Sequence, residues 1–333
     1  MRVAVTGASG FLGVNLVDRL VESRHEVVAL DRKIPDGPPR EGVSWARADV
    51  LDPVRMRAAL DGAEVVYHLA AVITLAHRDD RAWKVNTQGV RTVAEAAAAA
   101  GVRRMVHCSS IHSFDQHRCG GRIDESAPRS TDPGLPVYDR SKWQGEVELH
   151  SVIDSGLDAV ICNPTGVYGP VDYGLSRINA ILRDAARGRV PMMVDGTFDL
   201  VDVRDVADGL IAAADKGRTG ENYLLPGHMT RMLAACRLAA NATGRRGPWF
   251  GLPLRLVEAI TPIAEPIGAV FGSDLVSRAS LAALRATPIV DGAKARAELG
   301  YRARPAAETI RDLVEFFVAT GRLDRTPRVG AEL

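Results

Sequence analysis

Residues 3–13 read VAVTGASGFLG, and this stretch decides the fold expected for the chain. An apolar, β-branched run stops at Gly7, and glycines recur at Gly10 and Gly13. An amphipathic helix is expected immediately afterwards, because Leu16 and Leu20 recur on one helical face. A strand, a tight glycine turn and the start of a helix therefore follow one another directly.

The three glycines have different expected roles. Gly7 turns the chain, Gly10 lets the backbone approach a pyrophosphate, and Gly13 lets helix and strand pack closely. The first helical turn also presents free N–H groups and the positive end of the helix dipole to phosphates. The residues of this turn expected to bind a cofactor are Gly7, Ser9, Gly10, Phe11, Leu12 and Gly13.

An acidic residue ends the second expected strand. Residues 27–30 are apolar, and Asp31 follows them, eighteen residues after Gly13. A carboxylate here accepts hydrogen bonds from the adenosine ribose hydroxyls and repels a 2′-phosphate, which favours NAD over NADP. Arg32 complicates the choice, because an arginine at this point can pair with a 2′-phosphate. The alternative for Asp31 is a plain loop-opening residue.

Composition is that of an ordinary globular protein. The 333 residues are 46% hydrophobic and 25% charged, and the formal net charge is +1. The charge gives no indication of a nucleic-acid or membrane-surface partner. The four cysteines have no C-x-x-C spacing, and the chain begins in a strand without a charged and then apolar leader. Reduced thiols and a cytoplasmic location are therefore expected.

Strands and helices alternate through the first half of the chain, which predicts a parallel sheet with helices on both faces. Further strands are expected over residues 43–49, 64–69, 104–108 and 159–162. Helices are expected over residues 53–60, 82–100 and 137–153. Later helices are expected near residues 175–188, 204–216, 229–242, 252–270, 273–286, 291–299 and 305–320, with short strands near 192–194 and 221–225.

The expected fold is α/β: a Rossmann-type doubly wound parallel sheet with a smaller, mainly helical C-terminal substrate lobe. The cofactor domain would span residues 1–164, with some later segments returning to the sheet. The substrate lobe would span residues 165–325, and a tail would span 326–333.

Tyr138 and Lys142 are spaced so that they can act together. Positions i and i+4 lie one turn apart on the same helical face, so both side chains point into the same space. A phenol with a pKa of about 10 is a poor base at neutral pH, and a neighbouring ammonium would lower that pKa. Tyr-x-x-x-Lys also arises by chance on surface helices, but its place after the fifth strand favours a catalytic pair.

Two serines stand at the carboxyl end of the fifth expected strand, where doubly wound sheets bind ligands. A serine hydroxyl there can donate to a substrate carbonyl oxygen and hold it against the tyrosine. Ser109 is readily explained as the end of a strand, and Ser110 less so.

Together these motifs resemble an extended short-chain dehydrogenase/reductase of the NAD-dependent epimerase/dehydratase family. The matching set is TGASGFLG at 6–13, Asp31, Asp49, HLAA at 68–71, Val85-Asn86, Ser109-Ser110, Tyr138-x-x-x-Lys142 and Asn163-Pro164. The resemblance extends over nearly the whole chain, down to residues 293–301.

The resemblance implies a catalytic set in which Ser110 polarises a carbonyl, Tyr138 transfers the proton and Lys142 also grips the nicotinamide ribose. It further implies cofactor contacts from Asp49, Val50, Leu69, Ala70, Ala71, Ser109, Asn163, Pro164 and Val167. Asn86 would hold a water or a backbone carbonyl in a proton relay, although helix capping or packing explains it about as well. A homodimer that pairs the helix at 82–100 with the helix at 137–153 is also implied.

Within the family, the sequence favours the hydroxysteroid dehydrogenase and dihydroflavonol reductase-like branch. Asp31 followed by a basic residue, and the run SSI at 109–111, are closer to that branch. Sugar-nucleotide enzymes typically carry an arginine where this chain has Phe198, and a phenyl ring cannot form forked bonds with a diphosphate.

The expected activity is hydride transfer between C4 of nicotinamide and a secondary alcohol or ketone of a hydroxysteroid-like or other small hydrophobic substrate. One alternative is a nucleotide-sugar epimerase or dehydratase with tightly bound NAD. An alternative of another class is a non-catalytic protein that senses NAD(P).

Two further features are given structural explanations. The crowded residues His107, Cys108, His112, His117 and Cys119 fit no usual zinc spacing, so no metal is expected. Prolines and charged residues interrupt the apolar region at 249–271, which excludes a membrane span. Buried packing is favoured there over a membrane-surface or substrate lid.

Overall fold

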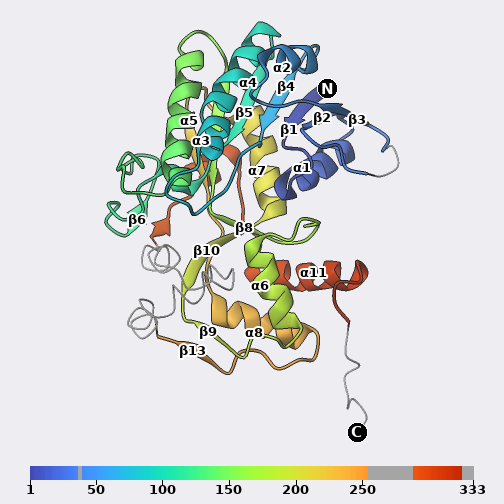
Figure 1. The fold of residues 1–333 in the computed structure, drawn as a ribbon, viewed down its shortest axis with the longest axis vertical. Helices are drawn as coiled ribbons and strands as arrows, with labels where there is room; N and C mark the ends of the chain where they lie inside the picture. The colour runs from blue at the N-terminus through green and yellow to red at the C-terminus, as the bar shows by residue number, and fades with distance from the viewer. Residues whose placement is uncertain (37–39, 254–287, 325–333) are drawn as a thin grey trace. The chain divides into compact units, whose positions relative to one another are not determined.

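The structure is a computed structural model that describes residues 1–36, 40–253 and 288–324 (Figure 1). These residues cluster in two units. The first unit comprises Met1–Thr165, Val203–Pro226 and Val290–Arg302, and the second comprises Gly166–Asp202, Gly227–Ile289 and Ala303–Leu333. Neither unit is a continuous piece of sequence, because the chain passes between them several times.

A seven-stranded parallel sheet forms the centre of the first unit, which confirms the expected doubly wound α/β fold. From one edge to the other, its strands are β11 (Asn222–Leu225), β7 (Ala159–Pro164), β5 (Arg104–Cys108), β4 (Val65–His68), β1 (Arg2–Thr6), β2 (Glu26–Asp31) and β3 (Val43–Arg47). The strand order reverses between β1 and β4, and ligands of such sheets bind in the crevice beyond the carboxyl ends at this point. β3 ends two residues before the expected Asp49.

Helices cover both faces of this sheet (Figure 1). One face carries α2 (Pro53–Ala59), α3 (Asp80–Asn86), α4 (Gln88–Ala99) and α5 (Val137–Ile153), and the other carries α1 (Phe11–Glu22) and α7 (Val203–Lys216). Because both faces are covered, β1 after Arg2 and the whole of β4 are continuously buried, with no alternation between buried and exposed residues. The core between the sheet and α2, α4 and α5 includes Leu30, Met56, Val93, Met105 and Leu149.

The single helix expected over residues 82–100 is two helices. α3 ends at Asn86 and α4 begins at Gln88, with Thr87 between them at φ −117° and ψ −74°. Thr87 Oγ1 donates to the carbonyl oxygen of Trp83 at 2.8 Å, a local bond of the kind that bends helices. The apolar pattern continues through the break, so the sequence does not reveal it.

The second unit contains three described helices, α6 (Arg177–Ala186), α8 (Met232–Ala242) and α11 (Ala306–Ala319). They pack with β8 (Gly166–Tyr168), β10 (Thr197–Asp202) and β12 (His228–Arg231), a three-stranded sheet that the sequence did not indicate. The helix expected at 229–242 therefore begins only at Met232, after β12. A further two-stranded sheet pairs β9 (Met192–Val194) with β13 (Phe250–Leu252).

Some expectations fall on residues that the structure does not describe. The helices expected at 252–270 and 273–286 lie outside the described residues, apart from Leu252 and Pro253, and so does the tail at 326–333. At the start of the apolar region, Trp249 is 71% exposed and Phe250 47% exposed. Buried packing is therefore the wrong interpretation for these two residues, because Phe250 begins the short strand β13, which pairs with β9, and Trp249 directly precedes it.

The first unit also contains short elements outside its large sheet. These are η1 (Ile111–Ser113), β6 (Arg122–Ile123), which pairs with β14 (Ile289–Val290), and the π-helical turn η3 (Ala295–Leu299). η3 replaces most of the α-helix expected at 291–299.

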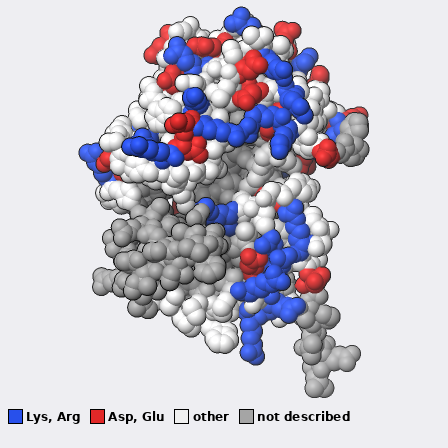
Figure 2. Space-filling model, viewed as in Figure 1, with Lys and Arg blue, Asp and Glu red and all other residues white. Residues whose placement is uncertain are grey.

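The helices of the described residues are all too short or too polar to cross a lipid bilayer. On the face in view, Figure 2 shows basic and acidic side chains interspersed over the first unit, which contains the seven-stranded sheet. This mixture agrees with the net charge of +1.

Candidate active site

Packing requires two of the three glycines that follow β1. Gly7 has φ +71°, and a Cβ there would lie 2.8 Å from the backbone nitrogen of Ala70. A Cβ on Gly13 would lie 2.2 Å from the carbonyl oxygen of Gly7. Gly10, the N-cap of α1, is different, because a Cβ there would meet only the Gly7 oxygen, at 3.2 Å. The fold itself thus demands glycine at positions 7 and 13, whereas a Cβ at position 10 would make a single tight contact.

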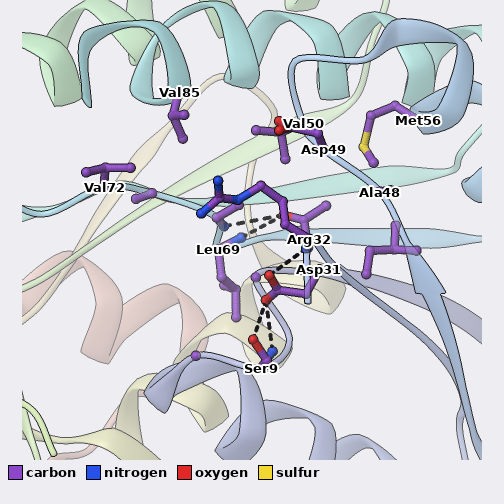
Figure 3. Close-up of a pocket in the computed structure, with 16 residues that line it drawn as sticks. Ser9, Asp31, Arg32, Ala48, Asp49, Val50, Met56, Leu69, Val72 and Val85 are labelled. Carbon is purple, nitrogen blue, oxygen red and sulfur yellow. Dashed lines mark hydrogen bonds between the residues drawn. The ribbon is translucent and has the colours of Figure 1, made fainter. Parts of the chain in front are cut away.

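A pocket lies at the carboxyl ends of β1, β2, β3 and β4 (Figure 3). Ten residues expected from the sequence to bind a cofactor line it: Gly7, Ser9, Gly10, Asp31, Arg32, Asp49, Val50, Leu69, Ala70 and Ala71. Six lining residues were not singled out as cofactor-binding: Thr6, Leu30, Ala48, Met56, Val72 and Val85. Only their positions in the sequence could have indicated a role in the pocket, since most of them end a strand or stand next to a motif.

Asp31 is held at this pocket by hydrogen bonds on both carboxylate oxygens. Oδ2 accepts from the Ser9 backbone nitrogen at 3.1 Å and from Ser9 Oγ at 2.7 Å, and Oδ1 accepts from the Arg32 backbone nitrogen at 2.7 Å. An ionised carboxylate offers about four lone-pair directions, so acceptor capacity remains for a ligand. Figure 3 shows the Arg32 side chain extending across the middle of the pocket.

The other expected cofactor residues do not line this pocket. They are Phe11, Leu12 and Gly13 in the first turn of α1, Asn86 in α3, Ser109 after β5, Tyr138 and Lys142 in α5, Asn163 and Pro164 at the end of β7, and Val167 in β8 of the second unit. Those in the first unit that follow β5 or end β7 share the carboxyl edge of the sheet with the pocket, because all seven strands run parallel.

Asn86 clamps the loop that follows β4. Its Oδ1 accepts from the backbone nitrogen of Val72 at 2.8 Å, and its Nδ2 donates to the Val72 carbonyl oxygen at 2.9 Å and to Ser141 Oγ at 3.0 Å. Of the roles open to it from the sequence, holding a backbone segment is the one these contacts match. The clamp ties a wall of the pocket to α5.

α5 carries Tyr138 and Lys142 to the carboxyl end of β5, where both are buried, at 9% and 4% exposure. Lys142 Nζ donates to the carbonyl oxygen of Cys108 at 3.0 Å. The Ser110 side chain lies close enough to the Tyr138 phenol to lower its pKa, and Ser110 Oγ accepts from the backbone nitrogen of His112 at 3.2 Å. The three expected catalytic residues therefore lie together.

Burial dominates the ionisation of this pair. Loss of hydration raises the pKa of Tyr138 above its ordinary value near 10, and the nearby Ser110 side chain opposes the rise only in part. Burial also lowers the pKa of Lys142, against the charges of Cys108 and Glu146. The expectation of a lowered tyrosine pKa is therefore wrong. Its physical reason is that spacing along a helix gives proximity but not the extent of dehydration.

His112 and Asp139 stand beside the tyrosine. The His112 and Tyr138 rings meet edge to face with centroids 5.4 Å apart, and His112 Nδ1 lies 3.0 Å from Asp139 Oδ1. The carboxylate thus fixes the orientation of the imidazole next to the phenol. In the sequence His112 was considered only for a metal site, and the described residues contain no group of three His, Cys, Asp or Glu side chains arranged to hold a metal ion.

Glu146 is a residue of this site that the sequence analysis missed. It is completely buried, and Oε1 accepts from Ser109 Oγ at 2.5 Å and from Asn163 Nδ2 at 2.7 Å. Its signal was available, because it follows Lys142 by four residues and so continues the helical face that carries Tyr138.

Comparison with known proteins now gives the class of the chain. Residues 3–225 match the NAD dependent epimerase/dehydratase family, and the chain belongs to this family. It is an oxidoreductase of the extended short-chain dehydrogenase/reductase type, as its motifs indicated.

Relatives and solved structures match over nearly the full length. The chain is 32% identical to sterol demethylase protein B of Methylococcus capsulatus, over 97% of this chain and 100% of the relative. It is 28% identical to the 3 beta-hydroxysteroid dehydrogenase/Delta 5→4-isomerase of Mycobacterium tuberculosis, over 90% and 85%. The crystal structure of gox2253 has a TM-score of 0.81 at 30% identity, over 97% and 99%. UDP-glucuronic acid 4-epimerase from Bacillus cereus, solved with NAD, shares the fold, with a TM-score of 0.74 at 20% identity over 96% and 99%.

Proposed function

We propose that the protein transfers a hydride between C4 of nicotinamide and a secondary alcohol or ketone carbon of a hydroxysteroid-like or other small hydrophobic substrate. The observation that carries this proposal is the meeting of Ser110, Tyr138 and Lys142 at the carboxyl end of β5. They share that edge of the sheet with the glycine-turn pocket.

The pocket residues fit NAD. Gly10 has an ordinary φ of −73°, and its lack of a side chain suits the close approach of a pyrophosphate to the backbone. The first N–H groups of α1 have no partner within the helix and are available to bind phosphate. Asp31 supplies an anionic acceptor for ribose hydroxyls, and its charge favours NAD over NADP. Bound there, the cofactor supplies or accepts the hydride.

The chain's own side chains handle the proton. In carbonyl reduction, Tyr138 donates its proton to the developing alkoxide, while Ser110 donates a hydrogen bond to the same oxygen. The raised pKa of Tyr138 keeps the phenol protonated at neutral pH, which suits it to this direction. In alcohol oxidation, Tyr138 must start as the phenolate, which the Lys142 ammonium stabilises, and it takes the hydroxyl proton to become the neutral phenol.

The choice of substrate class is supported by relatives and by Phe198. The names of the two relatives above refer to sterols and 3β-hydroxysteroids. Phe198 packs against the apolar core of the second unit and brings no charged donor for a diphosphate. Both points favour a hydrophobic ring substrate over a sugar nucleotide.

The test is Tyr138→Phe, with Tyr67→Phe as the matched control. Tyr67 is also buried, but it lies within β4. NADH absorbance is followed with 3β-hydroxysteroids, simple secondary alcohols and UDP-glucose. We expect turnover of a hydroxysteroid or alcohol, a loss of about 10²–10⁴-fold in kcat for Tyr138→Phe and little change for the control, with NADH affinity preserved in both.

Three results would overturn the proposal. Near-normal turnover by Tyr138→Phe would remove Tyr138 from the chemistry. Conversion of UDP-glucose alone would favour the epimerase reading. Tight NADH binding without turnover of any compound would favour a cofactor-sensing protein.

We further propose a cytoplasmic homodimer. Its interface would be the outer surface of α3, α4 and α5, where the alanine-rich α4 permits close approach of a second copy.

A further inference from the structure

Glu146 is a carboxylate without access to solvent, and it has four hydrogen-bond donors. Its side chain is 0% exposed. Oε1 accepts the two bonds from Ser109 and Asn163 described above, and Oε2 accepts from Asn222 Nδ2 at 3.0 Å and Arg129 Nη1 at 3.1 Å. Each oxygen therefore has two donors, which is the full acceptor capacity of the group.

The donors come from three neighbouring strands and one loop. Ser109 follows β5, Asn163 lies in β7 and Asn222 begins β11, and these strands are adjacent in the sheet. Asn222 Nδ2 also donates to Asn163 Oδ1 at 2.9 Å. Glu146 thus fastens α5 to three strands at once.

This network fixes the backbone that carries Ser110. Three consecutive residues of that backbone are held by side chains of the site. Lys142 binds the Cys108 carbonyl, Glu146 binds the Ser109 hydroxyl, and Asn163 Nδ2 donates to the Ser110 carbonyl at 3.1 Å.

The network also places charge next to a buried cation. Lys142 lies one helical turn from Glu146. Around Lys142, the other titratable groups are Tyr138 on the same helix, Cys108 and His107 on β5 and His68 on β4. Burial raises the pKa values of Tyr138 and Cys108 and so keeps both neutral, and the two histidines bring no negative charge to offset the ammonium. Arg129 is the second cation on Glu146.

We propose that Glu146 is a positioning residue of the proposed hydride-transfer site, where its buried carboxylate holds Ser110 in place and provides the negative charge that the Lys142 ammonium requires. The inference rests on the proposed function for its kinetic consequence. Its electrostatic part concerns Lys142 alone and does not depend on turnover.

Glu146→Gln tests both parts, because it keeps the size of the side chain and removes its charge. The new amide places an NH₂ group opposite donors that previously met an oxygen, which leaves buried donors unpaired. Removing the negative charge also disfavours the protonated form of Lys142, so the pKa of Lys142 falls. Glu148→Gln is the matched control, since Glu148 lies on the same helix but pairs with Arg91 and is 24% exposed.

The direct readout is NMR of protein labelled with ¹³C at the lysine ε carbons. The chain has five lysines, so Lys142→Arg identifies the signal of interest; the lysines are Lys33, Lys84, Lys142, Lys216 and Lys294. We expect Lys142 to titrate at lower pH in Glu146→Gln than in the wild type and to be unchanged in Glu148→Gln. An unchanged Lys142 titration in Glu146→Gln would overturn the electrostatic part.

The kinetic readout is the pH profile of kcat for the alcohol or ketone that turns over best. We expect Glu146→Gln to lose at least tenfold in kcat at neutral pH and to regain part of it at lower pH, where Lys142 is protonated again. Asn222→Ala removes one donor but keeps the charge, so it should lower kcat without moving the profile. A Glu146→Gln variant with kcat within twofold of wild type would overturn the positioning role.

A variant that fails to fold does not remove the test. Glu146→Asp keeps the charge but shortens the side chain, so we expect loss of kcat with an unmoved Lys142 titration, and a normal kcat would contradict the proposal. The two proposals fail separately. If Tyr138→Phe abolishes turnover and Glu146→Gln does not, only the role of Glu146 is wrong.

Discussion

The glycine turn and the end of β5, the two ends of the proposed site, differ in which atoms of the chain form them. The glycine turn is formed by backbone atoms, and these atoms limit the space for a side chain. A Cβ added at Gly13, for example, would lie 2.2 Å from the Gly7 oxygen. At the end of β5, it presents buried polar side chains, and Glu146 joins residues as far away in sequence as Asn222. We therefore expect an added methyl group to disrupt folding and cofactor binding at the glycine turn. At the end of β5, we expect the loss of one charge to lower kcat.

The strongest test of this contrast compares two alanine substitutions in one turn. Gly13→Ala forces a Cβ into the Gly7 carbonyl, so we expect a loss of about 3 kcal/mol in unfolding free energy and loss of measurable NADH binding. Gly10→Ala makes one tight contact, at 3.2 Å from the Gly7 oxygen, so it should destabilise the fold much less than Gly13→Ala does, while NADH affinity falls more than tenfold. Urea unfolding and fluorescence titration of both variants measure these effects. Equal destabilisation by the two substitutions would show that Gly10 serves the fold and not the ligand.

Features of local origin could be predicted from the sequence. The bounds of α5 follow from its pattern, and the glycine turn follows from spacing, since each depends on residues near one another in the chain. The break at Thr87 and the strand β10 could not be predicted in this way. The break involves a side-chain bond that leaves no mark on the apolar pattern, and β10 exists because it pairs with β8 and β12, far along the chain.

The site divides along the same line. The proposed roles of Tyr138, Lys142 and Ser110 come from a helical spacing and a strand end, both of which can be recognised in the sequence. The four donors around Glu146 come from separate segments, so no single stretch announces them. The direction of the tyrosine pKa was wrong for a related reason, since burial is a property of the folded chain.

A second group of buried polar side chains lies in β4 and β5, and its hydrogen bonding is incomplete. The rings of His68 and His107 stack with centroids 5.3 Å apart, and both are almost fully buried. His68 Nδ1 lies 2.7 Å from Thr6 Oγ1, but His68 Nε2 and both nitrogens of His107 have no hydrogen-bond partner in the part of the chain that the structure describes. Burial first, and the Lys142 charge second, lower the pKa of His68 to about 3 and that of His107 well below its ordinary value.

These histidines predict a loss of stability in acid. Their folded pKa values lie below the unfolded value near 6.5, so below that pH the unfolded chain binds protons that the folded chain does not. Their neutral form therefore supports the fold above pH 6.5, and this support is lost as the pH falls. Between pH 7.5 and pH 5, each such histidine costs about 2 kcal/mol.

His107→Leu measures this cost directly. We expect the difference in unfolding free energy between pH 7.5 and pH 5 to shrink by about 2 kcal/mol in the variant, because one proton-binding group of the unfolded state is gone. Urea unfolding at the two pH values gives the difference. His77→Leu, at an exposed position, should leave it unchanged. An acid loss as large in His107→Leu as in the wild type would assign the effect to other groups.

The smallest expected effect concerns the choice between NADH and NADPH at the pocket, where Asp31 is one of the few charged side chains. A 2′-phosphate would bring close to two negative charges beside it, and each unit pair at ~4 Å and an effective dielectric constant of ~20 costs about 4 kcal/mol before screening. Arg32, which crosses the pocket, offsets part of this cost, so we expect the wild type to prefer NADH over NADPH by at least tenfold, or about 1.4 kcal/mol. Asp31→Ala removes the repulsion and leaves Arg32, so the preference should move toward NADPH by at least tenfold.

The control is Asp49→Ala, which removes another carboxylate of the same pocket. It should weaken the binding of both cofactors without changing the ratio of their affinities. Fluorescence titration of both reduced cofactors into the three proteins decides the matter, and tighter NADPH binding by the wild type would mean that Arg32, and not Asp31, sets the selectivity.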